Sequence, residues 1–241
     1  MIINKAARIP ETRTFWRVMV LVMALALLSW AVLCVDVLAI MYCRYFSGYD
    51  MSFSQRSGNV FEQLYYQNFS LAVKKADLVI SAEKAVMKIS LVESYREGKF
   101  IGYCSLSGVS FEKSGLEGKI PSLDPVVGKI FSRETKYDHV NFMIEEGNAS
   151  TVIRDFQAVS DDVLLNGDMV HQMRLGDIYV NLDIMLSGKL SKDLLGDFRD
   201  YVLSKCGGKD WYKISIAVEG NTKKNWVNVN TDKIDIKIGS E

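Results

Sequence analysis

Apolar and polar residues alternate one by one along much of the chain, and this pattern restricts the fold more than any other feature. The clearest run has Ile178, Val180, Leu182, Ile184 and Leu186 separated by mostly polar residues. The same period recurs at 76–80, 140–144, 214–218, 227–229 and 234–238. A period of two places all the apolar side chains on one face of a strand. We therefore expect an antiparallel sheet with one apolar face and one wet face.

Glycine-containing and polar segments between these runs are predicted to be turns. They are Glu97-Gly98, Glu146-Gly147, Asn166-Gly167-Asp168, Ser187-Gly188 and Gly220-Asn221. Two short helices are also expected, one over Asp124–Ser132 and one capped by Ser191 and ending at Lys205, before two glycines. The stretch Asn59–Lys75 is ambiguous, because its apolar residues also fit the stripe of a helix.

A long apolar segment precedes the alternating region. Val18–Val35 reads VMVLVMALALLSWAVLCV, which is 18 residues without a charge. At about 1.5 Å per residue a helix of this length covers about 27 Å, close to the thickness of a hydrocarbon core. The run is longer than the apolar region of a signal peptide, and bulky Leu33 before Cys34 does not fit a lipoprotein site. We predict an uncleaved transmembrane helix over residues 18–43.

Basic residues predict the orientation of this helix. Four of them, Lys5, Arg8, Arg13 and Arg17, precede the apolar run, and fewer follow it. The positive-inside rule then keeps residues 1–17 in the cytoplasm. Residues 44–75 are expected to connect the helix to a β domain over residues 76–241, on the other side of the membrane. Asp36 either marks the outer interface or is a functional group inside the membrane.

Nothing in the sequence indicates catalysis. Lys plus Arg equals Asp plus Glu, at 29 each, so no net field favours nucleic acid. His139 and His171 do not have metal-ligand spacing, and the usual nucleophile and phosphate-binding motifs are missing. We predict no catalytic residue, no cofactor and no metal. Cys104 and Cys206 either form a disulfide or are small buried apolar residues.

The order of these features resembles the AsmA-like family of bacterial envelope proteins. The first matching stretch, over 76–107, is ADLVISAEKAVMKISLVESYREGKFIGYCSLS. The second, over 137–188, has the family's succession of strand, glycine-containing turn, strand, Asn-Gly step and long closing strand. The third is WYKISIAVEGNTKKNWVNVNTDKIDI, over 211–236, which looks like the family's closing hairpin.

This resemblance implies a mainly β fold: a curved antiparallel sheet with two short helices, preceded by one N-terminal transmembrane helix. It also implies a single-pass inner-membrane protein with a periplasmic C-terminal domain, and a role in envelope lipid handling or outer-membrane assembly. The implied partners are the lipid bilayer, phospholipid acyl chains and envelope proteins. The longest relatives are thought to conduct lipids along apolar grooves.

Two interpretations of the apolar face stay open. The even-numbered residues Ile178, Val180, Leu182 and Ile184 line either a lipid-binding groove or a closed core, because groove and core use the same residue types. A different function is that of a membrane-anchored adaptor of a secretion or envelope-assembly complex, which would pair exposed strand edges with a partner strand.

Overall fold

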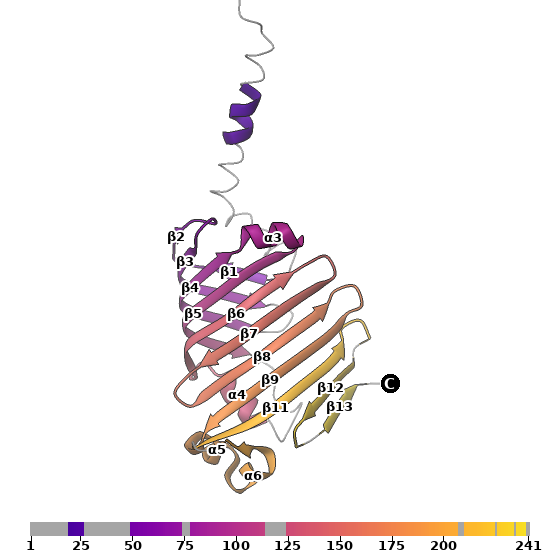
Figure 1. Ribbon diagram of the computed structural model, residues 1–241. Coiled ribbons are helices and arrows are strands. Elements are labelled where there is room, and N and C mark those ends of the chain that lie inside the picture. Colours follow the sequence, from indigo (N-terminus) through magenta and orange to yellow (C-terminus); the bar gives the residue numbers. More distant parts are fainter. Residues whose placement is uncertain are drawn as a thin grey trace, which may run out of the picture.

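The chain folds into one large antiparallel sheet (Figure 1). The structure is a computed structural model that describes residues 19–26, 49–73, 78–113, 124–206, 210–224, 226–233 and 235–239. Within these ranges 13 strands form a single sheet in the order β1-β3-β4-β5-β6-β7-β8-β9-β11-β12-β13, with β2 paired to β3 and β10 paired to β11. Neighbours on the main path are mostly consecutive in sequence, as the alternating pattern and its short turns favour.

The strands are β1 (Tyr49–Ser52), β2 (Gln55–Gly58), β3 (Leu64–Val73), β4 (Leu78–Ile89), β5 (Phe100–Lys113), β6 (Lys136–Glu146), β7 (Ser150–Val159), β8 (Val163–Gln172), β9 (Asp177–Ser187), β10 (Ser204–Lys205), β11 (Trp211–Asn221), β12 (Trp226–Thr231) and β13 (Asp235–Gly239). The helices are α3 (Leu91–Glu97), α4 (Asp124–Ile130), α5 (Gly188–Leu195), the 3-10 helix η3 (Gly196–Phe198) and α6 (Arg199–Val202). Residues 19–26 are also helical.

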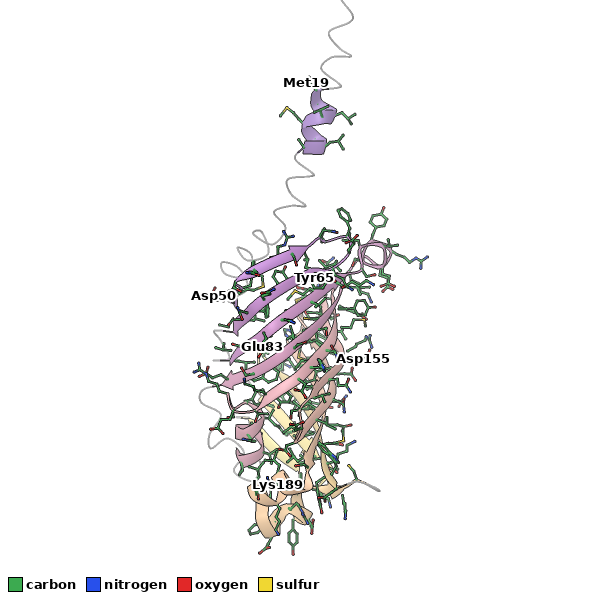
Figure 2. All side chains as sticks on the ribbon, turned by 90° about the vertical axis from the view of Figure 1, so that its left-hand side faces the viewer. Met19, Asp50, Tyr65, Glu83, Asp155 and Lys189 are labelled. Atoms are coloured by element: carbon green, nitrogen blue, oxygen red, sulfur yellow. The ribbon has the colours of Figure 1, made fainter. Side chains whose placement is uncertain are left out.

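The sheet is curved, so that the early strands turn behind β6 and β7 (Figure 1). A quarter-turn places the early strands in front, with Tyr65 near one end of the domain and Lys189 at the other (Figure 2). The strands begin and end along two opposite sides of the sheet. We call these sides edges, meaning the rows of strand ends and not the terminal strands. We call the edge that carries α4, α5 and the β7–β8 turn the α5 edge. The opposite edge carries α3 and the β6–β7, β8–β9 and β11–β12 turns, and we call it the turn edge.

The core fills the inner, concave face toward the α5 edge. Val126 and Ile130 of α4 are buried there, together with Leu195, Val202 and Leu203 from the segment around α5 and α6. Tyr137 of β6 is completely buried, and its hydroxyl donates to the carbonyl oxygen of Ile130 at 3.2 Å. The rings of Phe111 and Phe131 pack against the same region. The short helices therefore close one edge of the curved sheet.

Two turn and helix predictions were wrong in detail. Asn166, Gly167 and Asp168 do not form a turn but lie inside β8. A side chain at position 167 would put its Cβ 2.3 Å from the carbonyl oxygen of Asn181, so the glycine permits close strand contact rather than a turn. The expected helix from Ser191 to Lys205 begins earlier, at Gly188, and is interrupted at Gly196, whose φ is +53°.

The cap of this helix also differs from the prediction. Ser187 caps α5, because its Oγ accepts from the backbone N–H of Leu190 at 3.2 Å. Ser191 instead lies inside the helix, buried, and its hydroxyl donates to the carbonyl oxygen of Gly188. The other expected helix is confirmed as α4, which ends at Ile130, two residues earlier than predicted.

The N-terminal part of the sheet starts before residue 76. The ambiguous stretch from Asn59 contains β3, a strand paired with β1, β2 and β4. The sheet therefore includes residues 49–73, which were expected only to connect a membrane helix to the domain. Most of the predicted helix over 18–43 lies outside the described residues, and among the described residues no helix is both long and apolar enough to cross a bilayer.

Candidate functional site

One row of paired residues runs across the inner face and is fully buried. Direct partners in register carry it from β5 to β11, and we call it the core row. Its members are Leu106, Val140, Ala158, Leu165, Ile184 and Ile214, none of which is more than 4% exposed. Side chains facing one another across neighbouring strands pack directly, so this row is a continuous apolar layer.

A second row, four residues along each of four of the strands, is apolar but partly exposed. We call it the open row. Its members are Ile144, Ile153, Met169, Val180 and Val218, each paired with the next across β6, β7, β8, β9 and β11. All five are partly exposed and lie outside the buried core cluster. With about 4.8 Å between strands, the row extends for about 19 Å across the sheet.

The open row continues at both ends. On β12, Val229 pairs with Val218 and is buried. On β5, the partner of Ile144 is Gly102, which has no side chain. The ring of Phe100 takes up that space, since a Cβ on Gly102 would lie 3.0 Å from Cε1 of Phe100. Apolar groups therefore extend from the middle of the sheet to the start of β5.

A partly polar row borders the open row on the side of the turn edge. Glu146 pairs with Thr151, Thr151 with His171, and His171 with Ile178. The row then continues through Gly220 to Val227. An apolar strip with a polar border over β6–β8 suits an amphipathic ligand, whose chain and head group need different surroundings.

The position of the helices explains why one row is closed and the other open. Within the described part of the chain, α4, α5 and α6 lie at the α5 edge, where they cover the core row. At the turn edge, α3 has no buried residue and packs beside the start of β5. Both rows have similar side chains, so the difference in exposure follows from what covers them.

The four residues expected to bind lipid share the inner face but differ in accessibility. Val180 belongs to the open row and Ile178 to the bordering row. Leu182 is partly buried and packs against the core cluster. Ile184 belongs to the core row and is only 2% exposed. The open row thus includes Val180 and is bordered by Ile178, whereas Ile184 is part of the closed core.

The sequence does not predict that the other members of the open row belong to the same strip as Val180. Ile144 and Val218 stand in predicted strands, but nothing along the chain indicates that they align with Val180. Ile153 precedes a bulge at Asp155, whose φ is +53° and whose N–H donates to Oδ1 of Asp168 at 3.0 Å. This bulge interrupts the alternation in β7, so the signal that identified β9 is missing there.

The outer face is polar and held by ion pairs. Glu145 accepts from Nζ of Lys99 at 2.7 Å and from Nε of Arg154 at 3.0 Å. The hydrogen bond from Lys99 lowers the pKa of Glu145, and the same bond raises the pKa of Lys99. These side chains have mutual partners, and their arrangement is that of a structural network rather than of an acid–base pair in a cleft.

A second polar group lies on the outer side of β9 and β11. Asp183 accepts from Nζ of Lys213 at 2.8 Å and from Oγ of Ser215 at 2.7 Å. Partial burial raises the pKa of Asp183, but the hydrogen bonds from Lys213 and Ser215 lower it more, so that the pKa lies below its ordinary value. The inward and outward residues of β9 therefore alternate as predicted.

Cys104 and Cys206 are not bonded to each other. Cys104 lies between the two rows, paired with Met87 and Phe142, and burial raises its pKa to about 12. A thiol with such a pKa is mostly protonated and a poor nucleophile. Among the described residues, no group of three or more His, Cys, Asp or Glu side chains is arranged to hold a metal ion.

The outer face also has a shallow depression of about 310 Å³, lined mainly by residues such as Val86, Tyr103 and Asn141. Two of its lining residues, Ser105 and Asn141, are joined by a hydrogen bond of 2.7 Å that Ser105 donates. It contains no catalytic grouping, and it faces away from the open row. The open row is therefore the candidate functional site. No family model, no curated protein and no solved structure matches the chain.

Proposed function

We propose that this chain is an AsmA-like protein, anchored in the inner membrane by its N-terminal helix, whose periplasmic sheet handles envelope lipids or assists outer-membrane assembly. The open row carries the proposal. It is a strip of five apolar side chains, aligned across five neighbouring strands and left partly accessible. Apolar surface that stays accessible in an otherwise well-packed sheet is typical of a binding site.

The shape of this strip favours a long apolar ligand. The row runs across the strands rather than into the core, so an acyl chain would lie along it without opening the layer formed by the core row. Its length of about 19 Å is comparable with that of an extended acyl chain. The border of Glu146, Thr151 and His171 would face the polar end of such a lipid.

Lipid that remains bound during purification tests this function. The full chain is purified in mild detergent, extracted and analysed for phospholipid by mass spectrometry. We expect phospholipid in the wild-type protein and much less in the double variant Met169→Trp/Val180→Trp, because the two indole rings would occupy the middle of the open row. Both positions are partly exposed, so the larger side chains have room without overpacking the core.

The matched control is Val170→Trp/Tyr179→Trp. These residues form the adjacent pair on β8 and β9 but face outward, so this variant should keep its lipid. Circular dichroism and thermal unfolding check that both variants are folded. Lipid absent from the wild type, or lost equally from both variants, would remove the support for a groove along the open row.

The adaptor function is the second candidate, and the terminal strand of the sheet favours it. β13 is the last strand on the path through the described sheet, with β12 as its partner on that path. A terminal strand has backbone groups available for pairing with an added strand. A wild-type chain free of lipid that co-purifies with an envelope protein would favour this alternative.

A further inference from the structure

Large apolar side chains gather at the turn edge beside α3 and are more exposed than those of the open row. We call this group the α3 patch. It comprises Phe61, Leu91, Val92, Tyr95 and Phe100, whose exposed fractions range from 40% to 92%. Exposed apolar side chains that cluster in this way usually mark a contact surface.

The α3 helix presents its apolar side to solvent because its polar side is attached to the sheet. Leu91, Val92 and Tyr95 have helical spacing and lie on one side, while Ser94 points to the sheet, where its Oγ accepts from the N–H of Ile101 at 2.9 Å. Gly98 ends the helix with a φ of +63°. A helix of seven residues is too short to be stable alone, so these attachments to β5 maintain it.

Phe61 belongs to the same surface through the register of the sheet. Leu64 pairs with Met87, which places the β2–β3 turn next to the segment that leads from β4 into α3. Figure 1 shows β1, β2 and α3 together at one end of the domain. Phe100, whose ring covers Gly102, connects this patch with the open row.

We propose that the α3 patch inserts into the surface of the lipid bilayer that holds the N-terminal helix. This inference rests on the anchor of the proposed function but not on lipid binding along the open row. Only the 13 residues 36–48 separate the apolar run from β1. Fully extended, they span at most about 45 Å, so the start of β1 lies within that distance of the end of the apolar run. β1 and α3 lie at the same end of the domain (Figure 1), although Tyr49, where the chain enters β1, pairs with Val73 and so lies at the strand ends opposite to α3.

The composition of the patch favours lipid over a protein partner. Tyr and Phe are the aromatic residues that settle at the membrane interface, where an apolar ring and a polar tip both find suitable surroundings. A short amphipathic helix with its apolar side outward is the usual element for shallow insertion. Glu93, Arg96 and Glu97 give α3 no net positive charge, so we expect insertion to depend little on anionic lipid.

Photo-cross-linking from a single position tests this inference. The photoreactive residue p-benzoylphenylalanine replaces Tyr95 in the full chain, which is reconstituted in vesicles of phosphatidylethanolamine and phosphatidylglycerol. After irradiation, mass spectrometry identifies what is attached. We expect lipid adducts at position 95, at a yield several-fold above that of the control, and a similar yield when phosphatidylcholine replaces phosphatidylglycerol.

Tyr201 of α6 is the matched control, since it is 77% exposed but lies at the opposite edge of the sheet. Attachment of a second copy of the chain at position 95, or equal lipid yields at positions 95 and 201, would overturn the inference. Vesicle flotation separates the causes of failure. If the chain floats but gives no lipid adducts at position 95, only the insertion of the α3 patch is refuted. If the chain does not float, the membrane anchor of the proposed function is refuted as well.

The test is also independent of the groove. The variant Met169→Trp/Val180→Trp should give the same lipid adducts at position 95 as the unaltered chain, because the substituted residues lie away from α3. Loss of these adducts in that variant would mean that position 95 reports on lipid carried along the open row, and would overturn the bilayer contact.

Discussion

Leu165 and Met169 lie four residues apart on β8 and face the same side of the sheet, yet Leu165 is buried and Met169 is partly exposed. Each belongs to an apolar row across the strands, the core row and the open row. The side chains of the two rows are of the same kind, so hydrophobicity does not separate them. The two rows differ because the helices at the α5 edge cover the core row and not the open row. Two apolar rows of one sheet can thus differ only in what covers them.

The largest expected effect comes from placing the same charge in each row of β9. Ile184→Asp should prevent folding, because an unpaired carboxylate in a closed apolar layer costs several kcal/mol, a large part of the stability of a domain. Leu182→Asp should be severe but smaller, and Val180→Asp should cost about 1–2 kcal/mol, because water reaches that position. Urea unfolding of the full chain in mild detergent measures the series.

Asn181→Lys is the control for this series, because residue 181 faces outward next to Asp168. It should change the free energy of unfolding by less than about 0.5 kcal/mol. Equal losses at positions 180 and 184 would mean that both rows are equally closed, and the comparison between them would no longer hold.

A smaller effect is expected from adding one methyl group to a glycine of the inner face, either Gly167 between the two rows or Gly102 at the end of the open row. Gly167→Ala should cost about 1–3 kcal/mol, because its Cβ would lie 2.3 Å from a backbone oxygen of β9 and the strands would have to move. Gly102→Ala should be nearly neutral, because its Cβ would meet the ring of Phe100, an exposed side chain that can turn away. Thermal unfolding of the two variants measures the difference.

The reverse order, with Gly102→Ala more destabilising than Gly167→Ala, would show that the turn edge is packed as tightly as the interior. The inner face would then have no accessible strip, and the open row would lose its role as a candidate site.

The alternation in β9 and β11 is enough to predict the strands and their inner residues, because each apolar residue follows the last at a fixed distance along the chain. The open row depends instead on pairing between strands. Ile153 aligns with Met169 only because β7 has a bulge before Phe156, and no local pattern indicates that register. The open row and the core row therefore look alike in the sequence.

Gly167 illustrates the same limit for turns. Asn-Gly-Asp is typical of a turn, but the strand continues through it because the backbone of β9 approaches closely there. The helix around α5 was located within a few residues, yet its cap was assigned to Ser191 rather than Ser187. Both serines are compatible with a cap, and the choice depends on where β9 ends.

The smallest effect is expected on the outer face, at Asp183. Its ion pair with Lys213 is partly exposed, with side chains 40% and 37% accessible, so solvent screening limits its contribution to about 1 kcal/mol or less. Asp183→Asn keeps an oxygen that accepts from Ser215 and loses only the charge. Asp183→Lys places two cations together and should cost slightly more, but clearly less than Leu182→Asp at the next position.

The pH dependence separates this contribution from any loss of packing. Because the pKa of Asp183 is lowered in the folded protein, the carboxylate stabilises the fold at pH values above its unfolded pKa, near 3.9. That contribution disappears as the pH falls through the folded pKa. Wild type and Asp183→Asn should therefore differ at pH 7 and converge at acidic pH, once the carboxylate is protonated in the folded as well as in the unfolded protein, and 1 M salt should narrow the difference at pH 7. A difference that persists at low pH would mean that Asp183 contributes through packing, as residues of the inner face do, and the contrast between the two faces of β9 would be weaker than we infer.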